Sequence, residues 1–199
     1  MTQLAPIGFE SPYPTAISQV SRTGWRLIDH IVWHGVDAGG NPVVVETPAG
    51  QDSDFASSPA ALWSVYPPYG EYTAAAITHD RMWRVEVPAG RMTYRDADRH
   101  LRDMLRSCGE PWLRCQAMWA AVRWGSLLTR PGGHEGWLKD APAVLALTVV
   151  ALPFVLVAGG ANTAVRALFW LAERAVEPAA PQRHPRWVAQ PEVERGVAE

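Results

Sequence analysis

Residues 141–165 read APAVLALTVVALPFVLVAGGANTAV and contain no charged side chain. A bilayer core about 30 Å thick requires roughly 20 apolar residues in a helix that rises about 1.5 Å per residue. The stretch meets that length, and a membrane helix tolerates Pro153 better than a soluble helix does. We therefore predict a transmembrane helix over residues 141–161. The alternative is a buried helical hairpin of a soluble protein.

The flanking sequence differs from this segment in composition. Residues 131–140 contain Pro131-Gly132-Gly133 and predict a linker. Residues 162–177 place apolar side chains opposite charged ones and predict an amphipathic helix at the membrane surface. Residues 178–199 are rich in proline and charge, which is typical of a disordered tail. Basic residues stand on both sides of the span, so they leave its orientation open.

The overall composition limits the class of protein. The chain has 199 residues, with 18 basic and 20 acidic side chains and a net charge of −2. That length fits one domain with an appendage, and the charge excludes the basic surplus that nucleic-acid binding needs. Two cysteines exclude a disulfide scaffold and a four-cysteine zinc site. Residues 1–21, a polar N-terminal arm, lack a basic region followed by an apolar run, so no signal peptide is expected.

Residues 22–130 predict an α+β domain. A strand over residues 24–34, turn residues at 35–40 and the β-branched run 43–45 predict a β-hairpin. Apolar residues at helical spacing predict three helices, over residues 71–84, 94–108 and 111–128. Thr93 is the expected N-cap of the second of these helices. The predicted fold is a small N-terminal hairpin or sheet packed on a three-helix core, followed by a transmembrane or membrane-associated helical segment.

Two residues of this core, His79 and Asp98, are candidates for catalysis. His79 lies on the apolar face of its helix, and Asp98 lies on the packing side of the next helix. If the two helices pack antiparallel, the carboxylate can approach the imidazole. A carboxylate that accepts from one ring nitrogen fixes the tautomer and leaves the other nitrogen to take a proton from water.

Asp54 and Asp80 are candidates for binding a metal. Asp80 follows His79 and points about 100° further round the helix. There it could join Asp54, in Ser53-Asp54-Phe55, and loop carbonyls in holding a hard cation through oxygen ligands. Such a cation would stabilise a developing oxyanion.

Each of these residues also has a purely structural interpretation. His79 can be a hydrogen-bonded core residue, Asp98 a first-turn carboxylate that interacts with the helix dipole, and Asp54 the cap of a short helix after it. Cys108 and Cys115 lie on different predicted helices, which favours packing over metal binding.

A metal phosphohydrolase of the His-Asp type would need a further histidine upstream on a helix. His30 and His34 are the upstream histidines, and both lie in a predicted strand without a third ligand nearby. The sequence therefore disfavours that class.

Residues 45–126 resemble the phage-associated domain-of-unknown-function family 1353. The matching elements occur in the family's order: Pro48-Ala49-Gly50, Ser53-Asp54-Phe55-Ala56-Ser57-Ser58-Pro59, Leu62-Trp63, Pro67-Pro68-Tyr69-Gly70, Ala75-Ala76-Ile77-Thr78-His79-Asp80, Ala97-Asp98 and residues 118–125. The resemblance implies a protein encoded by a phage or prophage, often near tail or lysis genes. It implies no activity, because the family has none assigned.

A second resemblance is to the prokaryotic type of secreted phospholipase A2. It implies that Asp54 and Asp80 are calcium ligands, that His79 is the base for water and that Asp98 orients His79. Trp83 stands where that group has a tyrosine whose phenol bonds the aspartate. The group's disulfides are also missing, which leaves open an inactive relative that keeps only the helix pair.

Two functions follow as expectations. The first is a non-enzymatic phage protein, a membrane-associated component of the tail, virion-assembly or lysis module with a phospholipase A2-like domain. Its partners would be the membrane and other phage structural or lysis proteins, at the host cell's inner (cytoplasmic) membrane or in the virion. The alternative is a calcium-dependent phospholipid acyl-ester hydrolase with His79 as general base.

Overall fold

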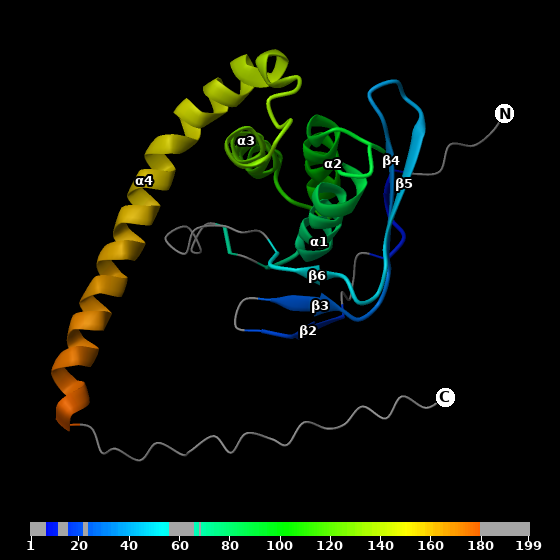
Figure 1. Ribbon diagram of the computed structural model, residues 1–199. Coiled ribbons are helices and arrows are strands. Elements are labelled where there is room, and N and C mark those ends of the chain that lie inside the picture. Colours follow the sequence, from blue (N-terminus) through cyan, green and yellow to red (C-terminus); the bar gives the residue numbers. More distant parts are fainter. Residues whose placement is uncertain (1–6, 12–15, 22–23, 56–65, 68, 180–199) are drawn as a thin grey trace, which may run out of the picture. The chain divides into compact units, whose positions relative to one another are not determined.

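The computed structural model describes residues 7–11, 16–21, 24–55, 66–67 and 69–179 (Figure 1). The described part of the chain is α+β, with short strands followed by helices. The strands are β1 (Gly8–Phe9), β2 (Ile17–Gln19), β3 (Trp25–Leu27), β4 (Ile31–Val36), β5 (Pro42–Thr47) and β6 (Asp52–Ser53). The helices are α1 (Thr73–Arg81), η2 (Met82–Glu86), α2 (Tyr94–Ser107), α3 (Trp112–Thr129), α4 (Trp137–Val176) and η3 (Glu177–Ala179).

The predicted hairpin is formed by β4 and β5. The two strands pair antiparallel, with Trp33 opposite Val45, and both side chains are buried. The carboxylate of Asp37 accepts the backbone N–H groups of Gly39 and Asn41 at 2.7 and 2.8 Å. Gly40 closes the turn at φ +82°, which a side chain would disfavour. β1 adds to the other edge of β4.

The predicted strand over residues 24–34 is wrong as a single element. It forms two strands in different sheets, because β3 pairs with β2 and β6 whereas β4 pairs with β1 and β5. Leu27 of β3 and Ile31 and Trp33 of β4 are buried at odd-numbered positions, which would form one face of a continuous strand. A continuous strand would place Asp29 on that same face. The bend at residues 28–29 leaves Asp29 exposed and avoids the burial of an unpaired carboxylate.

The three predicted core helices are present, with small changes at their ends. α1 ends at Arg81, and the chain continues directly as the π-helix η2. Thr93 caps α2, and its hydroxyl accepts the backbone N–H of Asp96 at 3.1 Å. Gly109, at φ +84°, follows the end of α2.

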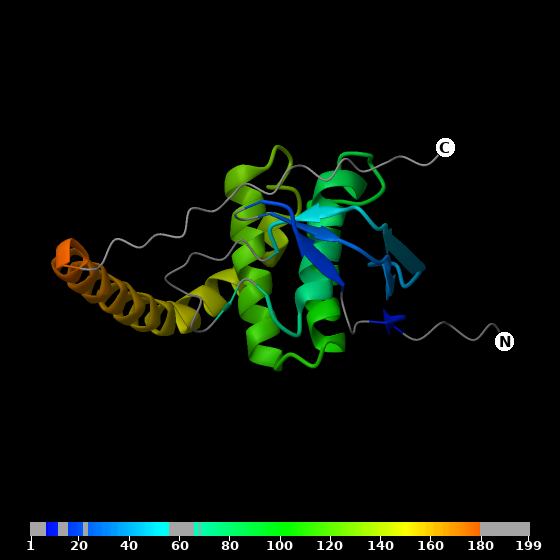
Figure 2. The ribbon, with the colours of Figure 1, turned by 90° about the horizontal axis from the view of Figure 1, so that it is seen from below.

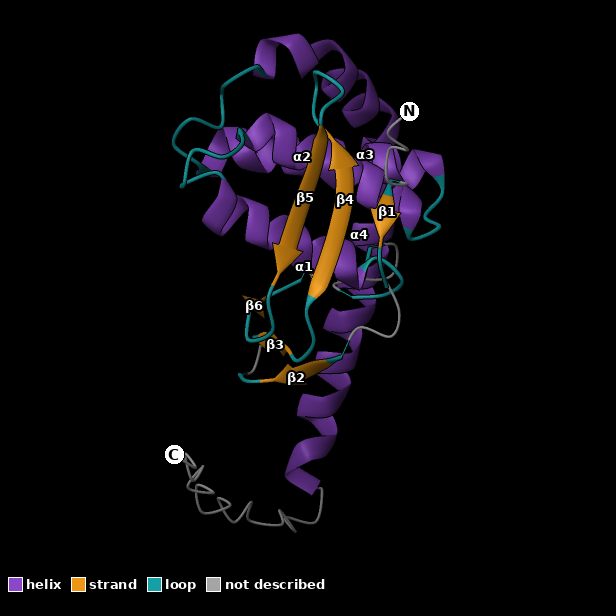
Figure 3. Ribbon diagram, turned by 90° about the vertical axis from the view of Figure 1, so that its right-hand side faces the viewer, coloured by secondary structure: helices purple, strands orange, loops and turns teal. Residues whose placement is uncertain are grey.

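These elements form layers (Figures 1 and 2). α1 and α2 lie between the β1-β4-β5 sheet and α3, and Figure 3 shows the three strands side by side on one face of the helices. The core between these layers contains Trp33 from the sheet, Met82 from η2 and Met104 and Leu105 from α2. The candidate residues His79 and Asp98 therefore lie on neighbouring helices of the middle layer.

α4 is one uninterrupted helix over the segments for which a transmembrane and an amphipathic helix are predicted. It begins inside the predicted linker, and its first turns pack on α3 through Val144, which contacts Trp119 and Ala120. By its length and apolar composition the helix is a candidate membrane span, and 6% of its apolar 18-residue window is buried. The chain forms two compact units, residues 1–162 and 163–199. Most of the predicted disordered tail, residues 180–199, lies outside the described residues.

Candidate functional site

The structure brings His79 and Asp98 together. The Nε2 atom of His79 lies 2.9 Å from Oδ1 of Asp98, and the two side chains are 9% and 0% exposed. His79 comes from the buried face of α1, and Asp98 comes from the first turns of α2. A carboxylate only accepts, so Nε2 carries the proton of this hydrogen bond and Nδ1 is the basic nitrogen of the ring. In the described part of the chain, no hydrogen-bond partner contacts Nδ1.

Asp98 also accepts from two other side chains. The indole Nε1 of Trp83 donates to Oδ1 at 2.9 Å, and Nη1 of Arg123 donates to Oδ2 at 3.1 Å. Trp83, at the position where the phospholipase resemblance predicts a tyrosine, is therefore one of the donors to this carboxylate. The Trp83 ring also packs on the His79 imidazole, with centroids 5.0 Å apart. Asp98 is therefore the centre of a polar network that joins α1, η2, α2 and α3.

Arg123 extends this network to the start of α4. Its side chain is fully buried, and its Nε lies 3.3 Å from Oδ2 of Asp140, an ion-pair distance without hydrogen-bond geometry. Arg95 holds the same carboxylate with two hydrogen bonds, of 2.9 and 2.7 Å. A buried guanidinium is tolerated only when charges and acceptors surround it. We name Asp98, His79, Trp83, Arg123 and Asp140 the buried polar network.

Arg95, Arg123 and Asp140 were not predicted from the sequence as members of the site. A signal for Arg123 was present, because it follows Trp119 by four residues and shares the stripe of Cys115 and Trp119 on the buried face of α3. A charged residue on such a stripe indicates a buried ion pair. Asp140 had no comparable signal, since its partner Arg95 is 45 residues away in the sequence.

The two candidate metal ligands are held together by an arginine. Nη2 of Arg84 lies 2.5 Å from Oδ1 of Asp54 and 3.7 Å from Oδ2 of Asp80. The Ser53 hydroxyl donates to Asp80 at 2.5 Å. Burial raises the pKa of the Asp80 carboxyl, against the lowering effects of the Ser53 hydrogen bond and of Arg84.

This arrangement does not fit a calcium ion as it stands. The guanidinium of Arg84 already supplies the positive charge between the two carboxylates, and a cation would have to displace it. Within the described ranges, no group of three His, Cys, Asp or Glu side chains could hold a metal ion. The short helix that Asp54 was expected to cap lies outside the described residues.

The remaining candidates have packing or surface positions. Cys108 and Cys115 are free and buried, and burial raises the pKa of the Cys108 thiol to about 11. Nε2 of His34 lies 2.7 Å from the Glu10 carboxylate, and His30 is exposed. None of these side chains joins the buried polar network.

Residues 25–122 match the model of a family described as "Protein of unknown function (DUF1353)", which supports the assignment of this domain to that family. The matched stretch covers the hairpin, α1, α2 and the first part of α3. It therefore includes His79, Asp98, Asp54 and Asp80, but it ends before Arg123 and Asp140. No curated protein and no solved structure matches the chain.

Proposed function

We propose that the protein is a non-enzymatic, membrane-associated component of a phage or prophage, acting in tail or virion assembly or in lysis. α4 would anchor it in the inner membrane of the host cell or connect it to the virion, and the DUF1353 domain would bind other phage proteins. The observation that carries the proposal is the exposed apolar surface of α4. Only 6% of the apolar 18-residue window in this helix is buried. An apolar surface of this size is expected to have a partner.

The contacts of the candidate site also support a structural role. Three side chains within the described residues, His79, Trp83 and Arg123, donate to Asp98 and join four helical elements. Arg84 stands between the two carboxylates that a metal would need. A polar network of this kind fixes one arrangement of the helices, since each member depends on the others for its hydrogen bonds.

The membrane part is tested by fractionation of cells that express the full chain. Val157→Arg places a charge on the apolar face of α4, where Val157 is 73% exposed, and Leu128→Arg makes the same change at a residue of α3 that is 75% exposed. A charge in the centre of a span costs about 2.5–3.5 kcal/mol. We expect Val157→Arg to lower the membrane-bound fraction and Leu128→Arg to leave it unchanged. Equal behaviour of both variants, or a soluble parent protein, contradicts the proposal.

The non-enzymatic part is tested with His79→Gln in a phage or prophage that carries the gene. Glutamine keeps an N–H donor for Asp98 but has no basic nitrogen. We expect phage production to follow the amount of folded protein and nothing else. A His79→Gln protein that is folded, abundant and membrane-bound but supports no phage production would contradict the proposal.

One observation favours the alternative, a phospholipid acyl-ester hydrolase. His79 presents Nε2 to Asp98 and keeps Nδ1 as a base, and the Trp83 indole donates to the same carboxylate. Nδ1 would take a proton from water as the water oxygen attacks the ester carbonyl. The ester C–O bond would then break, so that the fatty acid is released and the leaving oxygen of the lysophospholipid takes the proton from the imidazolium.

The alternative is measured as fatty-acid release from phospholipid vesicles, with and without calcium. It requires release by the parent chain that His79→Gln abolishes. Arg84→Gln removes the side chain that joins Asp54 and Asp80, so it should make calcium binding easier if those carboxylates form the metal site. Absence of release from all three proteins, with lipids of varied headgroup, excludes the hydrolase.

A further inference from the structure

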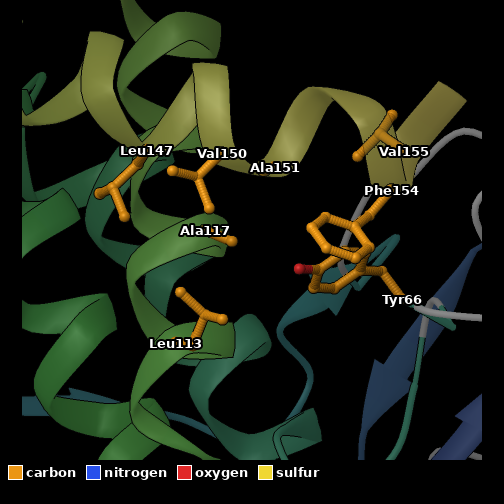
Figure 4. A pocket seen from close by; sticks show the side chains of 8 residues that line it. All are labelled: Tyr66, Leu113, Ala117, Leu147, Val150, Ala151, Phe154 and Val155. Carbon is orange, nitrogen blue, oxygen red and sulfur yellow. The ribbon is translucent and has the colours of Figure 1, made fainter.

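An apolar groove lies between α3 and the part of α4 that belongs to the first unit. Its volume is about 240 Å³, and the side chains that line it are apolar except for one tyrosine hydroxyl (Figure 4). Its main lining residues are Leu113 and Ala117 from α3, Leu147, Val150 and Phe154 from α4, and Tyr66.

The groove follows from the packing of the two helices. Nearer the start of α4, Val144 is buried against Trp119 and Ala120, and the Trp124 indole donates to Thr148 at 3.0 Å. α4 also presents Leu147, Val150 and Phe154 at a spacing of three and four residues, which places them on one face. α3 presents Leu113 and Ala117, four residues apart. These two stripes leave an open groove between them, and Leu113, Val150 and Phe154 stay exposed.

The occupant must be apolar and must also cover the rest of this face of α4. The groove is continuous with the outward surface of α4, because Val150 and Phe154 belong to both. No charge occurs in α4 between Ala141 and Val165. Acyl chains that surround α4 in a bilayer would therefore reach the groove without crossing a polar surface.

The end of α3 beside the groove has the chemistry of a membrane interface. Trp112, the first residue of α3, is 61% exposed, and Tyr66 lines the groove. Tryptophan and tyrosine are enriched where a bilayer meets water, since their rings are apolar and carry a polar group. Arg114, which pairs with Glu110 at 2.9 Å, supplies a partly exposed positive charge at the same end.

Charged groups near the other end of α3 limit how far the bilayer can extend toward the start of α4. Asp140 lies in the first turn of α4 and pairs with Arg95 and Arg123. These groups would stand in the hydrocarbon if the membrane enclosed α4 from Ala141 onward. A bilayer surface at the level of Leu113 and Val150 leaves them in water.

We propose that acyl chains of bilayer phospholipids fill this groove, so that the Trp112 end of α3 rests in the membrane interface and α4 enters the hydrocarbon near Val150. The inference rests on the proposed function and deepens it, because it names the lipid-contacting surface of the domain. It moves the beginning of the span about nine residues beyond Ala141, or roughly 14 Å along a helix. A span of about 20 residues from Val150 then includes Arg166 near its far end, where a long arginine side chain can reach the interface.

The test uses spin labels on the full chain in phosphatidylcholine–phosphatidylglycerol vesicles. Single cysteines are introduced by Leu113→Cys, Leu128→Cys, Leu145→Cys and Val157→Cys, at residues that are all exposed. Cys108 and Cys115 are buried, so the parent chain in the same reaction gives the background labelling. The measurement is the accessibility of each nitroxide to oxygen, which concentrates in lipid, and to a water-soluble nickel chelate.

We expect the labels at positions 113 and 157 to have a severalfold higher ratio of oxygen to nickel accessibility than those at positions 128 and 145. Position 128 is the matched control for position 113, because the two leucines lie on the same helix. A lipid-exposed label at 157 with an aqueous label at 113 overturns this inference and leaves the membrane anchor intact. Labels in water at both positions overturn the membrane anchor as well. A label at 113 shielded from both reagents, which a second copy of the chain would cause, also overturns it.

Discussion

The domain interior and the outer face of α4 depart from the usual distribution of side chains in opposite ways. Around Asp98, the domain buries charged groups where apolar side chains are the rule. Along α4, the chain exposes apolar side chains where charged ones are the rule. The buried charges have partners within the chain, whereas the exposed apolar face has none among the described residues beyond the first turns of α4. The first region therefore explains the fold, and the second region points to the function.

The two regions meet at Asp140. Its carboxylate lies in the first turn of α4 and forms ion pairs with Arg95 and Arg123 of the domain. The buried polar network therefore holds the base of the apolar helix as well as the helices of the core. The stability of the domain and the attachment of α4 are therefore expected to depend on the same charges.

The largest effect is expected from Asp98→Asn. The substitution keeps the shape of the side chain but removes the charge that balances the fully buried Arg123. Loss of one partner of a buried ion pair destabilises a protein by about 3–5 kcal/mol. The measurement is the free energy of unfolding of the full chain in mild detergent, from guanidinium denaturation. Asp103→Asn, the same change on α2 outside the network, is the control. A loss below about 1 kcal/mol for Asp98→Asn would show that Arg123 is solvated or otherwise paired.

A smaller effect is expected from Asp140→Asn. Asparagine can still accept from Arg95, but it loses the charge that strengthens both hydrogen bonds. Hydrogen bonds to charged groups contribute about 1.5–3 kcal/mol, so we expect a loss in this range. Hydrogen exchange should also become faster at residues 137–144 than in α1 and α2. Equal acceleration throughout the domain would mean that Asp140 supports the core and not the junction with α4.

The sequence was sufficient to predict most of the fold because local signals are strong there. Each of these signals lies within a short stretch of sequence. They are the Thr93 cap, the turn at Asp37–Gly40 and the apolar stripes of the helices. The strand over residues 24–34 was predicted wrongly because alternation alone does not tell which sheet a residue joins. Asp29, placed on the buried face of that strand, was the available warning.

The pairing of His79 with Asp98 was also within reach of the sequence, since adjacent helices must pack their apolar faces on each other. The same reasoning could not find Arg95 and Asp140, whose contact depends on the course of the chain between them. Nor could it show that Arg84 lies between Asp54 and Asp80. Residue spacing identifies side chains that can bind a metal. It does not show that a guanidinium of the same chain already lies between the two carboxylates.

The pH dependence of stability separates the domain interior from the surface. Burial lowers the pKa of His100, with a smaller contribution from Arg99. The unfolded chain therefore binds a proton that the folded chain does not, in the window below the ordinary histidine value of about 6.5. Stability is complete above that pH and falls as the pH drops through the window, by at most about 1.4 kcal/mol per pH unit for this group.

The measurement is the difference in unfolding free energy between pH 7.5 and 5.5 for the parent chain and for His100→Gln. We expect the substitution to reduce the decrease at pH 5.5, because glutamine does not titrate. His34→Gln is the matched control, since its imidazole is partly exposed and pairs with Glu10. If His100→Gln and His34→Gln reduce the decrease in unfolding free energy equally, the burial of His100 is not the cause of the acid sensitivity.

The smallest effect is expected from Asp52→Asn. Asp52 forms two hydrogen bonds with Arg26, at 2.7 and 3.1 Å, so its contact geometry is at least as good as that of Asp98 with Arg123. Both partners are exposed, however, and water can solvate each of them when the other is removed. We expect a change in unfolding free energy within the error of the measurement. The ratio of the change in unfolding free energy for Asp98→Asn to that for Asp52→Asn measures how much burial adds to the stabilisation by an aspartate–arginine pair. If the two substitutions destabilise the domain equally, contact geometry and not burial sets the contribution of an ion pair here, and the contrast between the interior and the surface fails.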